Sequence, residues 1–233
     1  MINTARLIEK AAAYGIEAAP IAPALDQYAA LLVDYNQKVN LTAITEPEAI
    51  EDKHFIDSLL LAASPEIHGA FVDVGTGAGF PGIVAKLYRP DLNLTLMEPT
   101  GKRVDFLRLA CETLNIEAEF AKERAEEAAR KRWRESFDTA TARAVASLPA
   151  LCEYCLPLVR VGGHFLAMKG GDADRESQDA APAAAGLGGT LREIRPFTLP
   201  DGSARTILIY EKTAPTPHAY PRNGGKIAKA PLR

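Results

Sequence analysis

The sequence has few cysteines, no long apolar run and no excess of positive charge. Three cysteines, Cys111, Cys152 and Cys155, are too sparse for a disulfide scaffold and indicate a reducing compartment. No stretch reaches the roughly 20 apolar residues of a membrane-spanning helix, and residues 1–20 lack the basic start and apolar run of a signal peptide. We therefore expect a cytoplasmic protein without membrane contact. Its 47% hydrophobic and 24% charged residues fit an ordinary globular chain.

The net charge of −3 argues against a generic nucleic-acid binder, but the charge is unevenly distributed. Residues 1–70 contain four Lys and Arg against ten Asp and Glu. After Glu211 the sequence has no acid and five basic residues: Lys212, Arg222, Lys226, Lys229 and Arg233. This division suggests a surface with a sided electrostatic role. A solvated tail explains the same pattern, so both interpretations stay open.

Hydrophobic periodicity divides the chain into three parts. Residues 1–65 predict a helical extension, because Leu25, Tyr28, Leu32 and Tyr35 fall on one face of a helix. Residues 66–213 alternate between strand-like and helix-like runs, which is typical of parallel βαβ units. Residues 214–233 form a basic tail, and we expect one compact unit overall.

The alternating part also predicts how the sheet ends. Strands are expected at 71–74, 92–97, 118–121, 137–142, 164–169, 190–199 and 205–212, with helices at 54–62, 82–88, 101–114, 123–133 and 148–159. Pro200, Asp201 and Gly202 are a hairpin turn signal between the last two strands. Residues 179–189 are interpreted as a frayed helix end and loop. The pattern predicts an α/β fold: a doubly wound, mostly parallel seven-stranded sheet ending in an antiparallel hairpin.

One predicted strand runs directly into three glycines spaced by two, Gly75, Gly77 and Gly79. Glycines there let a ligand lie against bare backbone, and N–H groups at the start of the next helix face it. Gly77 also begins a match to the nicotinamide pattern G-x-G-x-x-G, so an NAD-dependent oxidoreductase stays open. Asp73 before the first glycine, a strand ending at Val74 and the terminal hairpin favour S-adenosylmethionine and a Rossmann-like class I methyltransferase fold.

Polar residues follow the other predicted strands. Glu98 ends the second strand, 19 residues after Gly79, where an acid can accept hydrogen bonds from both ribose hydroxyls of a nucleoside cofactor. The ends of strands three to five carry Arg124, Ala125, Glu126, Arg143 and Lys169, on the edge where open α/β sheets bind ligands. Because an unpaired guanidinium is costly to bury, we interpret Arg143 as a residue that positions the cofactor.

Several strings resemble the bacterial small-subunit ribosomal RNA methyltransferase G family, also called glucose-inhibited division protein B. They match in order from about residue 25 onwards: 40–44 (NLTAI), 54–59 (HFIDSL), 73–82 (DVGTGAGFPG), 101–103 (GKR), 124–126 (RAE), 142–146 (ARAVA), 169–170 (KG), 220–222 (YPR) and 231–232 (PL). NLTAI and HFIDSL lie outside the cofactor loop, which makes the match specific. The sequence departs from the family at Glu98-Pro99, where the family has Asp-Ser, and near Ile227, where the family has Pro.

The resemblance implies transfer of a methyl group from S-adenosylmethionine to N7 of a guanine in 16S rRNA, guanine 527 of the decoding-site loop. The expected substrate is the rRNA within the small ribosomal subunit. Cofactor contacts are expected at Gly75, Gly77, Phe80, Glu98, Ala125, Glu126 and Arg143. RNA contacts are expected at Lys102, Arg103, Arg222, Lys226 and Lys229.

The chemistry of guanine N7 agrees with what the sequence lacks. N7 of neutral guanine is a lone-pair acceptor without a proton, so its methylation needs no general base. Alignment of the reactants can then supply roughly 7–11 kcal/mol. The chain has no Asn/Asp-Pro-Pro-Tyr motif for an exocyclic amine and no Pro-Cys nucleophile motif. We expect a monomer without a metal site. Besides the NAD-dependent oxidoreductase, a methyltransferase that acts on a small molecule is a second alternative to the rRNA methyltransferase.

Overall fold

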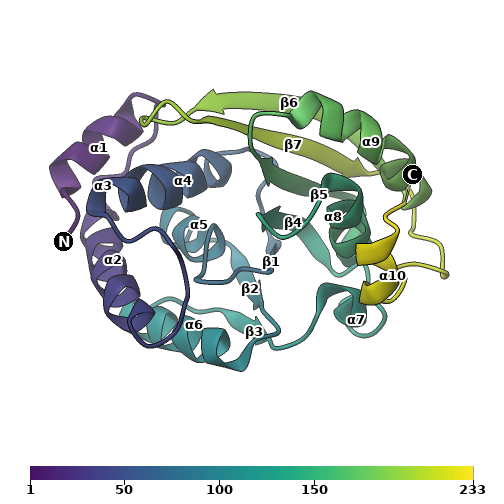
Figure 1. The fold of residues 1–233 in the computed structure, drawn as a ribbon, viewed down its shortest axis with the longest axis horizontal. Helices are drawn as coiled ribbons and strands as arrows, with labels where there is room; N and C mark the ends of the chain where they lie inside the picture. Colours follow the sequence, from purple (N-terminus) through teal and green to yellow (C-terminus); the bar gives the residue numbers. More distant parts are fainter. Residues whose placement is uncertain (233) are drawn as a thin grey trace.

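The computed structural model describes residues 1–232 (Figure 1). Within them, seven strands form one sheet in the order β3-β2-β1-β4-β5-β7-β6. The strands are β1 (Ala70–Val74), β2 (Asn93–Met97), β3 (Glu119–Ala121), β4 (Phe137–Arg143), β5 (Val159–Lys169), β6 (Gly189–Thr198) and β7 (Ala204–Lys212). β1 to β5 pair in parallel, and β7 is antiparallel to β5 and β6. The predicted fold class is confirmed.

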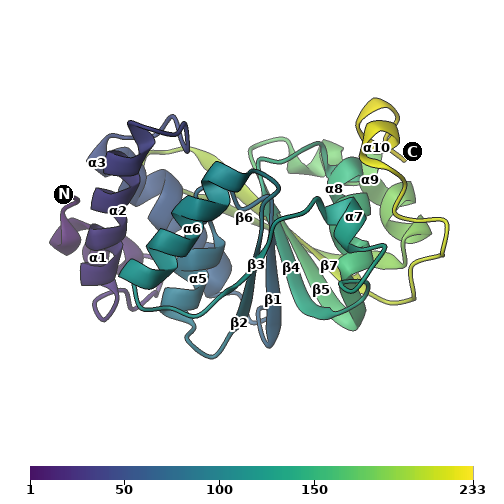
Figure 2. The same cartoon turned by 90° about the horizontal axis from the view of Figure 1, so that it is seen from below.

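Two layers of helices enclose this sheet (Figure 2). One layer contains α1 (Thr4–Ala12), α2 (Ala22–Asn36), α3 (Pro47–Ile50), a π-helical segment η1 (Glu51–Ile56), α4 (Asp57–Ala62), α5 (Gly82–Tyr88) and α6 (Gly101–Thr113). The other contains α7 (Ala125–Ala128), α8 (Leu148–Cys155), the 3-10 turn η2 (Leu156–Leu158), α9 (Ala173–Gly186) and α10 (Gly224–Lys229). No helix within residues 1–232 is long and apolar enough to span a membrane.

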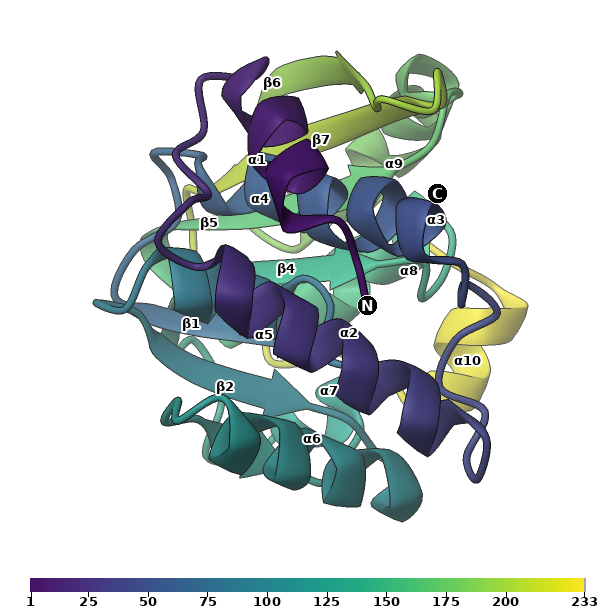
Figure 3. The same cartoon turned by 90° about the vertical axis from the view of Figure 1, so that its left-hand side faces the viewer.

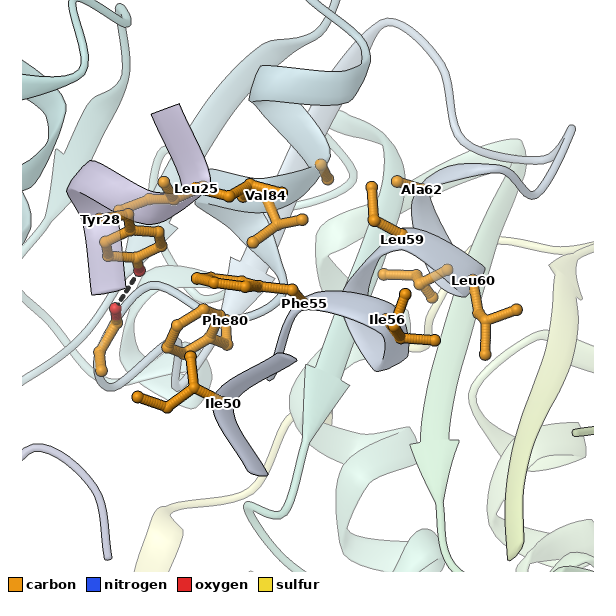
Figure 4. Packing of buried hydrophobic residues seen from close by; sticks show 14 of the residues in the cluster. Leu25, Tyr28, Ile50, Phe55, Ile56, Leu59, Leu60, Ala62, Phe80 and Val84 are labelled. Carbon is orange, nitrogen blue, oxygen red and sulfur yellow. Dashed lines mark hydrogen bonds between the residues drawn. The ribbon is translucent and has the colours of Figure 1, made fainter. Parts of the chain in front are cut away.

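The N-terminal extension shares its core with the glycine loop. Leu25, Tyr28 and Leu32 of α2 are fully buried, as the periodicity predicted. The ring of Tyr28 stacks on Phe80 with centroids 5.0 Å apart, and its hydroxyl donates to the carbonyl of Ala78 (Figure 4). Figure 3 shows α2 running alongside α6. The extension is therefore part of the structure that holds the loop after β1 in place.

Two predicted elements are wrong in extent. Residues 179–189 were predicted as a frayed helix end and loop, whereas the regular helix α9 continues to Gly186. Alanine has the highest helix propensity, and buried Ala180, Ala183 and Ala184 give this helix an apolar face despite Pro182. The helix predicted at 123–133 is only α7, because the chain then turns and Trp133 stacks on Phe137 with centroids 5.1 Å apart.

Candidate cofactor and acceptor sites

A cavity of about 650 Å³ lies at the carboxyl ends of the parallel strands. Its wall includes Gly75 after β1, Glu98 after β2, and Ala125 and Glu126 after β3. The segment 144–147 that follows β4 completes this side. The volume is within the range of small-molecule and cofactor sites. The sheet thus brings together four of the residues predicted to bind the cofactor.

The glycine loop has the shape of a ligand cradle. Gly75 has φ +67° and Gly77 has φ +58°, the left-handed region that favours glycine. A Cβ on Gly75 would come within 2.7 Å of the side chain of Val145, which also lines the cavity. A Cβ on Gly77 would approach no atom closer than the carbonyl of Gly75 at 3.9 Å, so this face of the loop is open. The loop therefore fits a ligand that lies directly on the backbone.

Two buried acids, Asp73 and Glu98, hold the glycine loop in place through hydrogen bonds. Asp73 is fully buried, and its Oδ2 accepts from the Thr76 hydroxyl at 2.6 Å and from the Gly82 amide at 2.8 Å. No group within residues 1–232 donates to Asp73 Oδ1, and burial raises the pKa of this carboxyl to about 6. Asp73 thus braces the turn into α5.

The second acid, Glu98, is only 2% exposed and its carboxylate is oriented by backbone amides. Its Oε2 accepts from the Gly77 amide at 3.1 Å, and its Oε1 accepts from the Thr100 amide at 2.9 Å. A carboxylate has about four lone-pair sites, so capacity for ribose hydroxyls remains. The glycine loop and this acid would suit the amino-acid end and the ribose of S-adenosylmethionine, and their contacts with the cofactor stay predictions.

The three other predicted cofactor residues, Gly77, Phe80 and Arg143, are not among the residues that line this cavity. Arg143 Nη1 donates to Asp57 Oδ2 at 2.7 Å and to the Lys53 carbonyl at 2.9 Å. The ring of Phe80 is buried and stacks on His54, with centroids 4.3 Å apart and planes 6° from parallel. Burial and the neighbouring Arg143 lower the pKa of His54 to about 3, so this ring is neutral. Cofactor contacts of Phe80 and Arg143 stay predictions.

A second cavity of about 340 Å³ opens on the other side of Ala144, which lines both cavities. Its charged wall has four cations and one carboxylate, a balance of +3 from 4 − 1: Lys53, Arg143, Lys169 and Arg205 with Asp57. The π-helical segment η1 and the start of α4 supply Lys53, His54 and Asp57, and π-helical turns are frequent at functional sites.

Sequence reasoning missed this second cavity as a site, although one signal was available. It placed Arg143 and Lys169 at strand ends but gave no chemical role to Lys53, Asp57 or Arg205. The string HFIDSL, residues 54–59, supplies His54 and Asp57. It was recognised only as a family string.

The C-terminal segment, residues 214–232, packs against the protein and reaches the cofactor cavity. Arg134 donates to the carbonyls of Thr216 and Tyr220, and Arg130 donates to the carbonyl of Pro221 at 2.8 Å. Ala228 and Pro231 then line the larger cavity. This part of the predicted basic tail therefore packs against the rest of the protein and forms one wall of that cavity.

The residues predicted to meet RNA differ in their freedom to do so. Arg222 donates from Nη2 to Glu153 Oε2 at 2.6 Å, and Glu153 is fully buried. A phosphate would have to compete with this ion pair. Lys102, Lys226 and Lys229 are exposed, whereas Arg103 lies on the wall of the cofactor cavity, 3.7 Å from Glu98 Oε2. Of these five residues, the three lysines are exposed and lack the contact with a buried acid that Arg103 and Arg222 make.

The described residues give no site for metal or thiolate chemistry. Within residues 1–232 no cluster of three or more His, Cys, Asp or Glu is placed to hold a metal ion. All three cysteines are buried, and burial raises the pKa of Cys111 and Cys152 to about 12. Both therefore remain thiols at neutral pH.

The sheet order, with the antiparallel β7 between β5 and β6, and the glycine cradle at the end of β1 define a Rossmann-like class I methyltransferase fold. Solved structures share it. A SAM-dependent O-methyltransferase from Thermotoga maritima superposes with a TM-score of 0.52 at 12% identity, covering 80% of this chain and 73% of that one. A precorrin-6y C5,15-methyltransferase from Geobacter metallireducens gives 0.52 at 12%, covering 72% and 90%. At this identity the likeness concerns the fold alone.

Sequence relatives identify the family. The family model for rRNA small subunit methyltransferase G, GidB, matches residues 21–198. Ribosomal RNA small subunit methyltransferase G of Moorella thermoacetica is 47% identical over 214 residues, covering 90% of this chain and 89% of the relative. The protein of that name from Leuconostoc mesenteroides subsp. mesenteroides is 44% identical over 213 residues, covering 89% of each. The chain belongs to the rRNA small subunit methyltransferase G family.

Proposed function

We propose that this chain transfers a methyl group from S-adenosylmethionine to N7 of one guanine in 16S rRNA, guanine 527 in the resemblance described above. The observation that carries the proposal is the larger cavity. In a member of this family it places the glycine loop at Gly75 beside the carboxylate of Glu98, which accepts from the Gly77 amide. We propose the small ribosomal subunit as the particle that presents this guanine.

S-adenosylmethionine supplies an electrophilic methyl group on a positively charged sulfur. The chain's own residues bind and orient the reactants. Gly75 and Gly77 would let the cofactor lie against bare backbone, and Glu98 would accept hydrogen bonds from its ribose hydroxyls. Guanine N7 brings its own lone pair, so no side chain has to remove a proton before attack. The protein's contribution is alignment of the two reacting atoms.

Contacts with RNA are proposed for the exposed lysines. Lys102 at the start of α6 and Lys226 and Lys229 of α10 are exposed and carry the charge that phosphates attract. Arg103 and Arg222 were also predicted to contact RNA. Since both already lie beside a buried acid, we propose that they mainly hold the cofactor cavity and the C-terminal segment in shape.

The test is transfer of labelled methyl from S-adenosylmethionine to small subunits taken from a strain that lacks this protein. Label confined to one guanine of 16S rRNA, recovered as 7-methylguanine, is the expected result. Binding of S-adenosylmethionine without label on the subunits would remove the substrate and leave the cofactor assignment. Binding of NAD with no binding of S-adenosylmethionine would remove both.

A further inference from the structure

Asp57 is a carboxylate in the wall of the smaller cavity that the proposed methyl transfer does not use. Its side chain is only 4% exposed, and its Oδ2 accepts from Arg143 Nη1 at 2.7 Å. Arg205 Nε lies 3.6 Å from Oδ1, close enough for an ion pair but beyond hydrogen-bond distance. Since a carboxylate has about four acceptor sites, Asp57 keeps acceptor capacity within the cavity.

The chain holds Asp57 in place through both specific strings of the N-terminal extension. Arg143, which binds Asp57, is itself positioned by the Lys53 carbonyl at 2.9 Å and lies 3.3 Å from His54 Nδ1. His54 Nε2 lies 3.0 Å from the hydroxyl of Thr42. NLTAI and HFIDSL therefore meet around one guanidinium at the end of β4, and this network fixes the carboxylate before any ligand arrives.

The surroundings of Asp57 suit a flat, partly polar ring. Ile44, Ala144 and Met168 give the cavity apolar surface. All four cations already have an anionic partner: Lys53 Nζ lies 3.2 Å from Asp201, Lys169 Nζ lies 2.7 Å from Glu176, and Arg143 and Arg205 both pair with Asp57. Asp57 is the sole acid in this wall among the described residues. A base that offers hydrogen-bond donors would find its acceptor there.

We propose that Asp57 recognises the target guanine by accepting a hydrogen bond from its 2-amino group at Oδ1. This inference rests on the proposed function and adds the residue that selects the base. Adenine has no 2-amino group, so it would leave the buried carboxylate without this donor. Sites built to hydrogen-bond a substrate group reject analogues that lack it far more strongly than apolar pockets do.

The orientation of the base follows from the same contact. The 2-amino group and N7 lie on opposite sides of the guanine ring, so a base held at Asp57 presents N7 away from that carboxylate. Ala144 lines both the smaller cavity and the cofactor cavity, so N7 would face the side from which the methyl group comes. Methylation makes the ring positively charged, and the negative charge of Asp57 opposes the unfavourable effect of the surrounding cations.

The test compares small subunits rebuilt with guanosine or inosine at the target position, since inosine lacks only the 2-amino group. The full-length chain and its Asp57→Asn variant are assayed for methyl transfer to each, and S-adenosylmethionine affinity is measured by calorimetry. Glu51→Gln is the matched control, because Glu51 is a buried acid on η1 that pairs with Arg6 and does not line the cavity.

We expect the unmodified chain to methylate inosine subunits at least tenfold more slowly than guanosine subunits. Asp57→Asn should lose at least tenfold on guanosine, treat both subunits alike and bind S-adenosylmethionine within twofold of the unmodified chain. Glu51→Gln should keep the full discrimination. Equal rates of the unmodified chain on both subunits would overturn the inference without requiring any variant to fold, as would a discriminating Asp57→Asn. No transfer to either subunit would instead count against the proposed function.

Discussion

Replacing Glu153 by Gln should loosen the C-terminal segment and leave the sheet intact. The buried carboxylate accepts from the Arg222 amide at 2.7 Å, from Nε at 2.9 Å and from Nη2 at 2.6 Å. Glutamine keeps one acceptor oxygen and turns an NH₂ group towards the guanidinium. Breaking one side of a buried ion pair costs about 3–5 kcal/mol. Because the Arg222 side chain is 23% exposed and water solvates part of its charge, we expect about 2 kcal/mol.

Amide hydrogen exchange measures this change where it occurs. The amides of Ile227 and Ala230 are bonded to carbonyls within the segment and report its opening. A loss of about 2 kcal/mol should speed their exchange roughly 30-fold, while strand amides stay protected. Because Ala228 and Pro231 line the cofactor cavity, S-adenosylmethionine should restore part of the protection.

A matched substitution separates this local effect from general destabilisation. Glu51 is also fully buried and pairs with Arg6, with Glu51 Oε2 2.7 Å from the guanidinium. Glu51→Gln should leave exchange at Ile227 and Ala230 unchanged. The reasoning is refuted if Glu153→Gln leaves these two amides as protected as before, or if S-adenosylmethionine does not slow their exchange.

Three further predictions concern the loop and its supports. Gly77→Ala should weaken S-adenosylmethionine binding at least tenfold in calorimetry and cost about 1 kcal/mol of stability, because φ is +58° and the methyl group enters the open face of the cradle. Asp73 has a folded pKa near 6, above its unfolded value, so its contribution to stability is lost as pH rises from about 4 to 6. The free energy of unfolding in urea should therefore increase for Asp73→Asn relative to the unmodified chain across that pH range. His54 has a folded pKa near 3, below its unfolded value, so its contribution is lost as pH falls below about 6.5; His54→Gln should lose less stability between pH 7 and 5 than the unmodified chain.

Local patterns predicted the parallel sheet and the cofactor loop because both depend on residues that are close together in the sequence. An apolar run ending at Val74 and glycines at alternating positions define a strand, a turn and a ligand cradle within ten residues. The acid at Glu98 follows from the next strand by the same rule. The structure places Gly75 and Glu98 in one cavity because parallel strands end at one edge of the sheet.

Contacts between distant segments were beyond the reach of periodicity. Arg143 was expected at a strand end, but its partners Asp57 and Lys53 lie 86 and 90 residues earlier, in a helical extension whose pattern indicated only packing. The tail was interpreted by its charge, whereas Arg222 binds an acid 69 residues away. A count of basic residues does not reveal which cations a buried carboxylate already holds.

The most direct test of the account concerns the atom that receives the methyl group. Small subunits would be rebuilt with 7-deazaguanosine at the target position, which replaces N7 by a C–H group and leaves the 2-amino edge unchanged. We predict that the chain methylates guanosine subunits, binds the 7-deaza subunits with similar affinity, and transfers no methyl to them. Transfer to the 7-deaza subunits at a rate like that on guanosine would contradict it.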